Sequence, residues 1–178
     1  MAALSFMSQR RQKPRVAYFD HGTTSGSAAR QFVASYCATH SLELRVGELQ
    51  NQKPKGASQE EHWRNERYLF LHSLDGPVVM AHNLNDCMET WVFTALNGDP
   101  KLIPYSNRNV VRPFLATPKS EFIRWCTRHM TPWLEDTSNT DVRYTRNRIR
   151  RCIMPEALVI NPGLYKVIKK KLLSRGIE

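Results

Sequence analysis

Polar side chains that could carry out chemistry gather within residues 77–91, PVVMAHNLNDCMETW. Asp86 and Glu89 are three residues apart, so a helix that begins near Asn85 would place both on one face of its first turn. Two carboxylates beside a helix N-terminus can bind a magnesium ion or an ammonium group, because the helix dipole keeps them ionised. The spacing alone is equally compatible with Asp86 and Glu89 capping a helix and with His82 making an ordinary turn hydrogen bond.

The residues just before this polar segment predict where it lies in the fold. Residues 78–80 are apolar, which is typical of a short strand buried on both faces of a parallel sheet. His82 would then lie at the carboxyl end of that strand. Active sites of open α/β sheets lie at this edge, so the segment is placed where chemistry is expected.

The N-terminal part of the chain predicts a βαβ unit. Residues 15–20 and 42–46 have the pattern of strands, and residues 28–40 that of a helix, with Ser25 or Ser27 as its cap. Strand, helix and strand in this order predict a parallel sheet with right-handed crossovers. The fold class is therefore α/β.

The middle of the chain combines helix signals with basic side chains. Ser58 followed by Glu61 is a capping-box signature for a helix over residues 59–73, which carries Arg64 and Arg67 on one face. By themselves these two arginines are typical of a solvated helix face.

The C-terminal third predicts more helices and a concentrated positive charge. Thr117 or Ser120 would cap a helix that ends at His129. An arginine-rich run follows at residues 143–151, and a basic helix is expected over residues 165–175. Such runs bind phosphate groups generically, although an exposed solvated tail has the same composition.

The charge balance predicts a polyanionic partner. The 178 residues include 26 Lys and Arg against 16 Asp and Glu, a formal net charge of +10. This excess favours nucleic acid over membrane, since no basic amphipathic segment with an aromatic face stands out. A generically basic soluble protein is the alternative.

Cysteine usage and chain length narrow the class further. The four cysteines form no C-x-x-C pair, which argues against zinc and iron–sulfur sites. The sequence shows no secretory signal and no apolar run of membrane-spanning length, so we expect a cytoplasmic protein with no membrane partner. Its length predicts one domain with a good core.

Four segments match the signatures of a known enzyme family in order and spacing. Residues 16–23, VAYFDHGT, resemble a strand that ends in a His-Gly pair, and residues 62–71, HWRNERYLFL, an Ala-Arg-x-x-Arg-Tyr-x-x-Leu helix. Residues 81–90, AHNLNDCMET, resemble His-x-x-x-Asp-x-x-Glu-Thr. Residues 133–150 contain Trp-x-x-Asp-x-Ser-Asn and then Arg-x-Thr-Arg-Asn-x-Ile-Arg, the most specific of the four. The chain resembles the tRNA(Ile)-lysidine synthetases, which are PP-loop ATP pyrophosphatases.

The resemblance does not extend to the phosphate loop. Lysidine synthetases begin with a strand followed by Ser-Gly-Gly-x-Asp-Ser, whose N–H groups cradle the ATP phosphates. Residues 1–4 resemble the helix that follows that loop, so we expect the first strand and the PP-loop to be missing. A misassigned start, a natural loss and a loop supplied by an upstream polypeptide are the alternatives.

The resemblance implies a Rossmann-like parallel sheet of the adenine nucleotide alpha hydrolase-like type with a C-terminal helical extension. Residues 1–116 would form the PP-loop-type nucleotide-binding core. Residues 117–178 would form a helical, basic, tRNA-contacting extension of the same domain.

The resemblance also implies roles for individual residues. The catalytic residues would be Asp86, Glu89, His82 and Arg146. The nucleotide-binding residues would be His21, Gly22, Arg64, Arg67 and Arg112. The tRNA-binding residues would be Arg143, Asn147, Arg148, Arg150, Arg151, Lys169 and Lys170. An acidic turn would contain Asp136, Ser138 and Asn139. The metal ligands stay unassigned, because Asn85 stands where the family commonly has an aspartate.

The implied reaction converts the wobble cytidine of an isoleucine tRNA to lysidine in two steps. ATP, with Mg²⁺, adenylates the oxygen on carbon 2, and the side-chain amine of free lysine then displaces AMP. Asp86 and Glu89 would hold the lysine, and Arg146 or Arg150 would stabilise phosphate charge. The implied partners are tRNA and free lysine; a homodimer would enlarge the tRNA surface, although no segment requires one.

Two other functions stay open at this point. A PP-loop cytidine thiolase would act on tRNA as well, but it would need paired cysteines for sulfur transfer. A catalytically inactive remnant that retained only the tRNA-binding surface would fit the missing loop.

Overall fold

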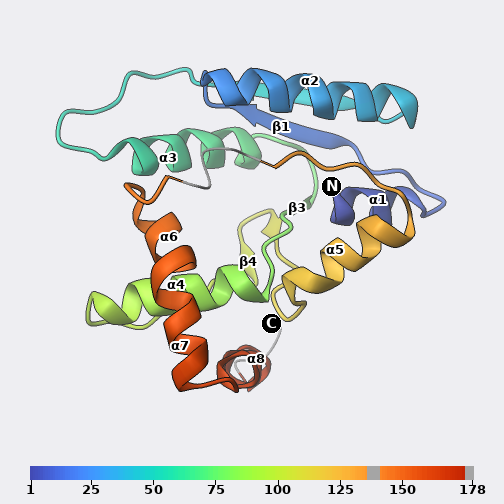
Figure 1. Ribbon diagram of the computed structural model, residues 1–178. Coiled ribbons are helices and arrows are strands. Elements are labelled where there is room, and N and C mark those ends of the chain that lie inside the picture. Colours follow the sequence, from blue (N-terminus) through green and yellow to red (C-terminus); the bar gives the residue numbers. More distant parts are fainter. Residues whose placement is uncertain (136–140, 175–178) are drawn as a thin grey trace.

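The computed structural model describes residues 1–135 and 141–174, in which long helices accompany short strands (Figure 1). The strands are β1 (Val16–Asp20), β2 (Leu44–Glu48), β3 (Val78–Val79), β4 (Ser106–Asn107) and β5 (Val110–Val111). The helices are α1 (Ala2–Ser8), α2 (Thr24–Thr39), α3 (Gln59–His72), α4 (Leu84–Leu96), α5 (Lys119–Arg128), α6 (Thr145–Arg148), the π-helix η2 (Ile149–Ile153), α7 (Met154–Ile160) and α8 (Leu164–Ser174). The predicted acidic turn of Asp136, Ser138 and Asn139 lies outside the described residues.

The strands pair largely as the βαβ pattern predicts. β1 and β2 are parallel along their whole length, with Val16 opposite Leu44 and Asp20 opposite Glu48. β3 and β5 are also parallel, and β4 pairs antiparallel with the other edge of β5. Parallel pairing is therefore confirmed. Among the described strands, however, hydrogen bonds form two sheets, β1-β2 and β3-β5-β4, where the sequence predicted one.

The second strand begins two residues later than predicted because Leu42 belongs to the end of the preceding helix. The Leu42 N–H donates to the Cys37 carbonyl at 2.9 Å and so closes the C-terminal turn of α2. The Leu42 side chain is buried with Tyr36 and Cys37. An apolar residue at this position packs on α2 and is not available to start the strand.

The turn from β1 into α2 is held by side chains that differ from the predicted caps. α2 begins at Thr24, and Thr23 Oγ1 accepts a hydrogen bond from the Gly26 N–H at 3.1 Å. The predicted caps Ser25 and Ser27 are therefore wrong. Asp20 Oδ1 accepts from the Gly22 N–H, and a Cβ on Gly26 would lie 2.9 Å from that oxygen. Glycine at position 26 lets the turn close on Asp20.

Helix α3 lies close to the first sheet, and the predicted cap is confirmed. Ser58 caps it, accepting from the Glu61 N–H at 3.1 Å. The Phe70 ring packs on Gly47 of β2, where a Cβ would lie 2.5 Å from the ring carbons. Only glycine permits so close an approach, so Gly47 determines how near α3 lies to the sheet.

The segment around the acidic residues forms a strand end and a capped helix. β3 comprises only Val78 and Val79, and both are half-buried, so the predicted burial on both faces is wrong. α4 begins at Leu84, with Asn83 as N-cap. Asn83 Oδ1 accepts from the Asp86 N–H at 3.3 Å, and Asp86 Oδ2 accepts from the Asn83 N–H at 2.8 Å. This reciprocal capping box fixes the direction in which α4 leaves the strand.

The main hydrophobic core lies between α4 and the C-terminal helices. Figure 1 shows α6, η2 and α7 as one column that crosses α4, with α8 at its lower end. Buried apolar residues from these elements form a single cluster that includes Leu84, Met88, Ile149 and Ile168. The core therefore holds the arginine-rich segment against the start of α4.

Helix α5 has a different start from the one predicted. It begins at Lys119 after Pro118, and no side chain of its N-cap residue makes a capping hydrogen bond. The predicted caps Thr117 and Ser120 are therefore wrong. The Lys119 N–H donates instead to Asn85 Oδ1 on α4, at 2.9 Å.

Among the residues described, no helix has both the length and the apolar character needed to cross a bilayer.

Candidate active site

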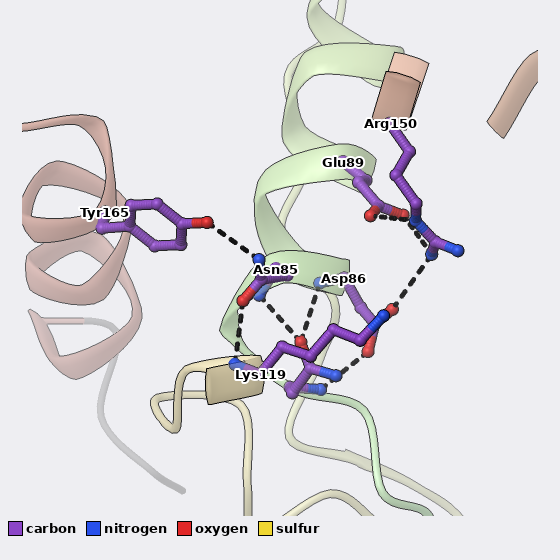
Figure 2. A network of polar contacts seen from close by, with 7 residues as sticks. Asn85, Asp86, Glu89, Lys119, Arg150 and Tyr165 are labelled. Carbon is purple, nitrogen blue, oxygen red and sulfur yellow. Dashed lines mark hydrogen bonds and ion pairs between the residues drawn. The ribbon is translucent and has the colours of Figure 1, made fainter. Parts of the chain in front are cut away.

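The predicted acidic pair lies on the first turns of α4, where a guanidinium group binds it (Figure 2). Arg150 donates from Nε and Nη2 to the two carboxylate oxygens of Glu89, at 2.7 and 2.8 Å. The same Nη2 lies 3.9 Å from Asp86 Oδ1. Glu89 is 6% exposed, and its hydrogen bonds raise the pKa of Arg150 above the ordinary value. One cation is thus shared between two carboxylates of different exposure.

Asn85, beside this pair, joins three helices through its side-chain amide. Its Oδ1 accepts the Lys119 N–H at the start of α5, and its Nδ2 donates to the Tyr165 hydroxyl on α8 at 2.8 Å. Figure 2 shows these bonds on the side of α4 away from Arg150. The amide at this position therefore tethers α5 and α8 to α4.

His82, which precedes α4, lies among four arginines. Burial is the main reason that the pKa of His82 falls to about 4. The positive charges that lower it further belong to Arg112, Arg67, Arg146 and Arg64. Within the described residues every charge that shifts this pKa is positive. His82 is therefore neutral at pH 7, in surroundings suited to an anion.

Arg67 experiences the same accumulation of positive charge. Burial lowers the pKa of its guanidinium, and the charges of Arg64 and Arg146 lower it further. Arg64 and Arg67 lie on α3, whereas Arg146 lies on α6. Tertiary packing thus collects cations from distant parts of the sequence in one place, and such a cluster is stable only when anions or solvent compensate it.

Five buried nitrogen atoms in this region have no hydrogen-bond partner among the described residues. We call them the nitrogen cluster: His21 Nδ1, Trp63 Nε1, Arg67 Nε, His82 Nδ1 and Arg112 Nε. Buried polar groups in folded proteins are nearly always hydrogen-bonded. Because indole and guanidinium nitrogens can only donate, at least three members of the cluster need an acceptor. The oxygens of a phosphate or of a nucleobase would supply it.

His21 and Trp63 connect the first sheet to this cluster. Their ring centroids are 5.3 Å apart, and His21 also contacts Phe19 of β1 at 5.0 Å. Burial lowers the pKa of His21, and the charge of Arg67 lowers it further. Gly22 follows with a positive φ of 70° on the exposed turn. Of the two predicted nucleotide-binding residues of the first turn, His21 therefore lies near Arg67 of α3.

Arg112 has a more internal position than its predicted nucleotide-binding role requires. It is 2% exposed, and it donates from Nη1 to the Pro104 carbonyl and from Nη2 to the Tyr68 hydroxyl, at 2.8 and 2.7 Å. The Arg64 guanidinium lies 5.1 Å from the centre of the Tyr68 ring. Arg112 thus holds α3 against the β4–β5 region, and its Nε is the atom that joins the nitrogen cluster.

Most of the predicted tRNA-binding residues lie at the surface. Arg143 is exposed and its guanidinium binds Asp141 at 2.7 Å, while the Asn147 amide donates to the Asp141 carbonyl at 2.9 Å. The remaining exposed cations of this set are Arg148, Arg151, Lys169 and Lys170. Arg150 differs from these, because its guanidinium turns inward to Glu89.

Some residues of the site carry no signal in the sequence. Trp63 lies on α3, and its Nε1 belongs to the nitrogen cluster. Tyr165 and Lys119 contact Asn85 from helices that follow it by 80 and 34 residues. The sequence also left Arg146 and Arg150 as alternatives for stabilising phosphate charge. The structure separates them: Arg146 acts on His82 and Arg67, and Arg150 binds the acidic pair.

Comparison with known proteins shows which family the chain belongs to. The model of the PP-loop domain family matches residues 1–157. A tRNA(Ile)-lysidine synthase of Thermotoga sp. is 31% identical over 181 residues, which cover 92% of this chain and 44% of the relative. The corresponding enzyme of Thermosipho africanus is 33% identical over 159 residues, covering 82% of this chain and 37% of the relative.

A third relative, from Staphylococcus aureus, carries the same name and is 29% identical over 154 residues. That match covers 78% of this chain and 36% of the relative. The chain therefore spans less than half the length of these curated relatives.

Proposed function

Because this chain belongs to the PP-loop domain family, we propose that it binds ATP and uses it to convert the wobble cytidine of an isoleucine tRNA to lysidine. The observation that carries the proposal is the nitrogen cluster, together with a pair of carboxylates on α4, the helix that follows His82. Unpartnered donors and uncompensated arginines fit the phosphates of a nucleotide, and the carboxylates fit the ammonium group of an amine substrate. The names of the relatives supply tRNA(Ile) as the substrate class.

In the first step the cytidine O2 attacks the α-phosphorus of ATP, and pyrophosphate leaves. Negative charge builds on the departing phosphates, so fixed cations nearby lower the barrier. Arg67 and Arg146 suit this role, because each lowers the pKa of His82 and both therefore act on the same point. Arg64 would contribute from the exposed side of α3.

In the second step the side-chain nitrogen of lysine attacks carbon 2, and AMP leaves with the oxygen. Asp86 and Glu89 would hold the incoming ammonium group. The amine must lose a proton before it attacks. His82 is neutral in the free protein, with its Nδ1 unpartnered, and phosphates bound among the arginines would raise its pKa. His82 is therefore our candidate for the proton acceptor.

Mg²⁺ would neutralise phosphate charge in the first step. The described residues contain no group of three or more His, Cys, Asp or Glu side chains that could hold a metal ion. Magnesium in nucleotide-dependent enzymes commonly has only one or two carboxylate ligands besides phosphate and water. We therefore expect it to enter with ATP, and we assign no metal ligand to the protein.

The deciding experiment is tRNA-dependent exchange between ATP and labelled pyrophosphate, combined with mass spectrometry of the digested tRNA. We expect exchange with unmodified isoleucine tRNA and a lysine-adduct nucleoside when lysine is added. Arg67→Gln should lower the exchange rate by about 100-fold, as loss of a group that stabilises transition-state charge does. Arg124→Gln, on the surface of α5, is the matched control and should leave the rate unchanged.

Binding of tRNA with steep salt dependence but without exchange would contradict the proposal. The protein would then be a tRNA-binding module. A sulfur-containing nucleoside in place of the lysine adduct would instead identify a cytidine thiolase.

A further inference from the structure

We propose that Arg150 occupies the position of the substrate ammonium group in the free protein, and that a tRNA phosphate must draw it away before lysine can bind. Arg150 would thereby impose an order on the reaction, with tRNA first and lysine second. This inference rests on the proposed function, in which the carboxylates Asp86 and Glu89 hold the lysine side chain. It adds a role for a residue that neither step uses directly.

The charges at the site show why Arg150 and a substrate ammonium group exclude one another. The guanidinium makes two hydrogen bonds to Glu89, one to each carboxylate oxygen, so both oxygens are engaged. The Glu89 side chain is 8% exposed, which leaves no room for a second cation from solvent without movement of Arg150. An ammonium group can therefore reach Glu89 only by replacing the guanidinium.

Only another cation can replace the Arg150 guanidinium at Glu89. A carboxylate as buried as Glu89 is strongly destabilised when it is left without a partner. Removal of Arg150 by itself is therefore unfavourable, but removal coupled to entry of an ammonium group conserves the charge. Asp86, whose side chain is 23% exposed and lies 3.9 Å from the guanidinium, offers the second carboxylate on the entry side.

The Arg150 side chain is partly open to solvent, and a phosphate at the surface would compete with Glu89 for its guanidinium. Its side chain is 35% exposed, and it lies in η2, a π-helix, which is a helix irregularity often found at functional sites. Arg148 and Arg151, its near neighbours, are exposed cations of the predicted tRNA surface. A phosphate arriving at that surface gives the guanidinium an alternative bidentate acceptor.

The test measures how tightly L-lysine binds to the full chain, by isothermal titration calorimetry, with and without saturating unmodified isoleucine tRNA. For the wild-type protein we expect tRNA to lower the Kd for lysine at least tenfold. Arg150→Gln should bind lysine at least tenfold more tightly than wild type without tRNA, and tRNA should then change its Kd little. Arg128→Gln removes the same charge from an exposed position on α5, away from the predicted tRNA surface, and should behave like wild type.

The same lysine Kd with and without tRNA in the wild-type protein would overturn the inference, as would weaker lysine binding by folded Arg150→Gln. Circular dichroism establishes whether that variant is folded. If it is not, Arg150→Lys takes its place, because it keeps the cation but loses the bidentate geometry. Lysine binding that is tighter than wild type supports the inference, and unchanged binding contradicts it.

The two hypotheses fail in different ways. Lysine binding that is independent of tRNA removes the ordering role of Arg150 and leaves the proposed function intact. No lysine binding by any variant, while ATP still binds, removes the lysine step of the proposed function and the inference with it.

Discussion

At the scale of single residues, burial and nearby charge determine what each candidate side chain can do. Asp86 and Glu89 have similar chemistry, but Asp86 caps α4 and remains partly open, whereas Glu89 is buried on Arg150. His82 and His21 both have lowered pKa values, with burial as the larger cause for each. These neutral imidazoles are suited to accept protons once anions bind nearby.

The lowered pKa of His82 predicts how stability depends on pH. Its pKa falls from 6.5 to about 4 on folding, so between these values the unfolded chain binds a proton that the folded chain does not. Stability should therefore fall as the pH drops from 6.5 towards 4, by up to about 3 kcal/mol from this group.

Urea unfolding at a series of pH values measures this effect. His82→Gln should show a shallower loss of stability over the same window, because glutamine does not titrate. Equal pH slopes in wild type and His82→Gln would show that His82 titrates normally in the folded protein.

At the scale of elements, the site depends on how two helices are started and placed. The capping box between Asn83 and Asp86 directs α4 away from β3. The contact between Gly47 and Phe70 sets the distance of α3 from the first sheet. α4 carries the acidic pair, and α3 carries Arg67 and Trp63. The positions of both groups therefore depend on the capping box of α4 and on the contact between Gly47 and Phe70.

Loss of the cap on α4 should weaken the protein measurably. Asn83→Ala leaves two N–H groups at the start of α4 without their side-chain acceptor, and should cost about 1 kcal/mol of unfolding free energy. Thermal denaturation followed by circular dichroism measures the loss. Asn65→Ala, in the middle of α3, is the matched control, and an equal effect of both changes would argue against the cap.

An added methyl group at Gly47 should displace α3. The new Cβ would lie 2.5 Å from the Phe70 ring, so Gly47→Ala should destabilise the fold by about 2 kcal/mol, as overpacking does. ATP binding should weaken as well, because α3 carries Arg67 and Trp63. At Gly163 a Cβ would meet only the end of the Asn161 side chain, at 3.2 Å, so Gly163→Ala is the milder control. Unchanged stability and ATP affinity in Gly47→Ala would contradict this account.

At the scale of the whole molecule, the chain carries a formal net charge of +10. Within the site, however, positive and negative side chains form two separate groups. Cations of α3 and α6 surround His82, while carboxylates of α4 bind Arg150. The arginine-rich segment, residues 143–151, contributes Arg146 to the cations around His82 and Arg150 to the ion pair with the carboxylates. A polyanion that binds the outer surface would therefore act on both parts of the site at once.

The exposed lysines of α8 should contribute to tRNA affinity by neutralising phosphates. Replacing Lys169 and Lys170 together by glutamine should reduce the slope of log K against log salt concentration by about 0.7–0.9 for each phosphate that the variant no longer neutralises. Lys53 and Lys55, in the loop before α3, give a double variant with the same change in net charge. Filter binding at several salt concentrations should show the smaller slope only for the α8 variant. Equal slopes for the two variants would place the tRNA elsewhere.

Local patterns in the sequence were sufficient for much of the fold. The parallel pairing of β1 and β2, the Ser58 cap of α3 and a helix carrying Asp86 and Glu89 all follow from residues close together in the chain. The family signatures also lie within short segments. These features are readable because strand, cap and helix preferences depend on neighbours a few residues away.

Tertiary structure alone decided how the charged residues are divided. Arg146 and Arg150 are four residues apart and look interchangeable in sequence, yet one acts on His82 and the other binds Glu89, 61 residues earlier in the chain. Arg112 was predicted to bind the nucleotide; its side chain is almost fully buried and hydrogen-bonded through Nη1 and Nη2, and only its Nε belongs to the nitrogen cluster. Partners this distant are set by the packing of α4 against η2 and α8, and burial then determines which charges are paired and which can bind a ligand.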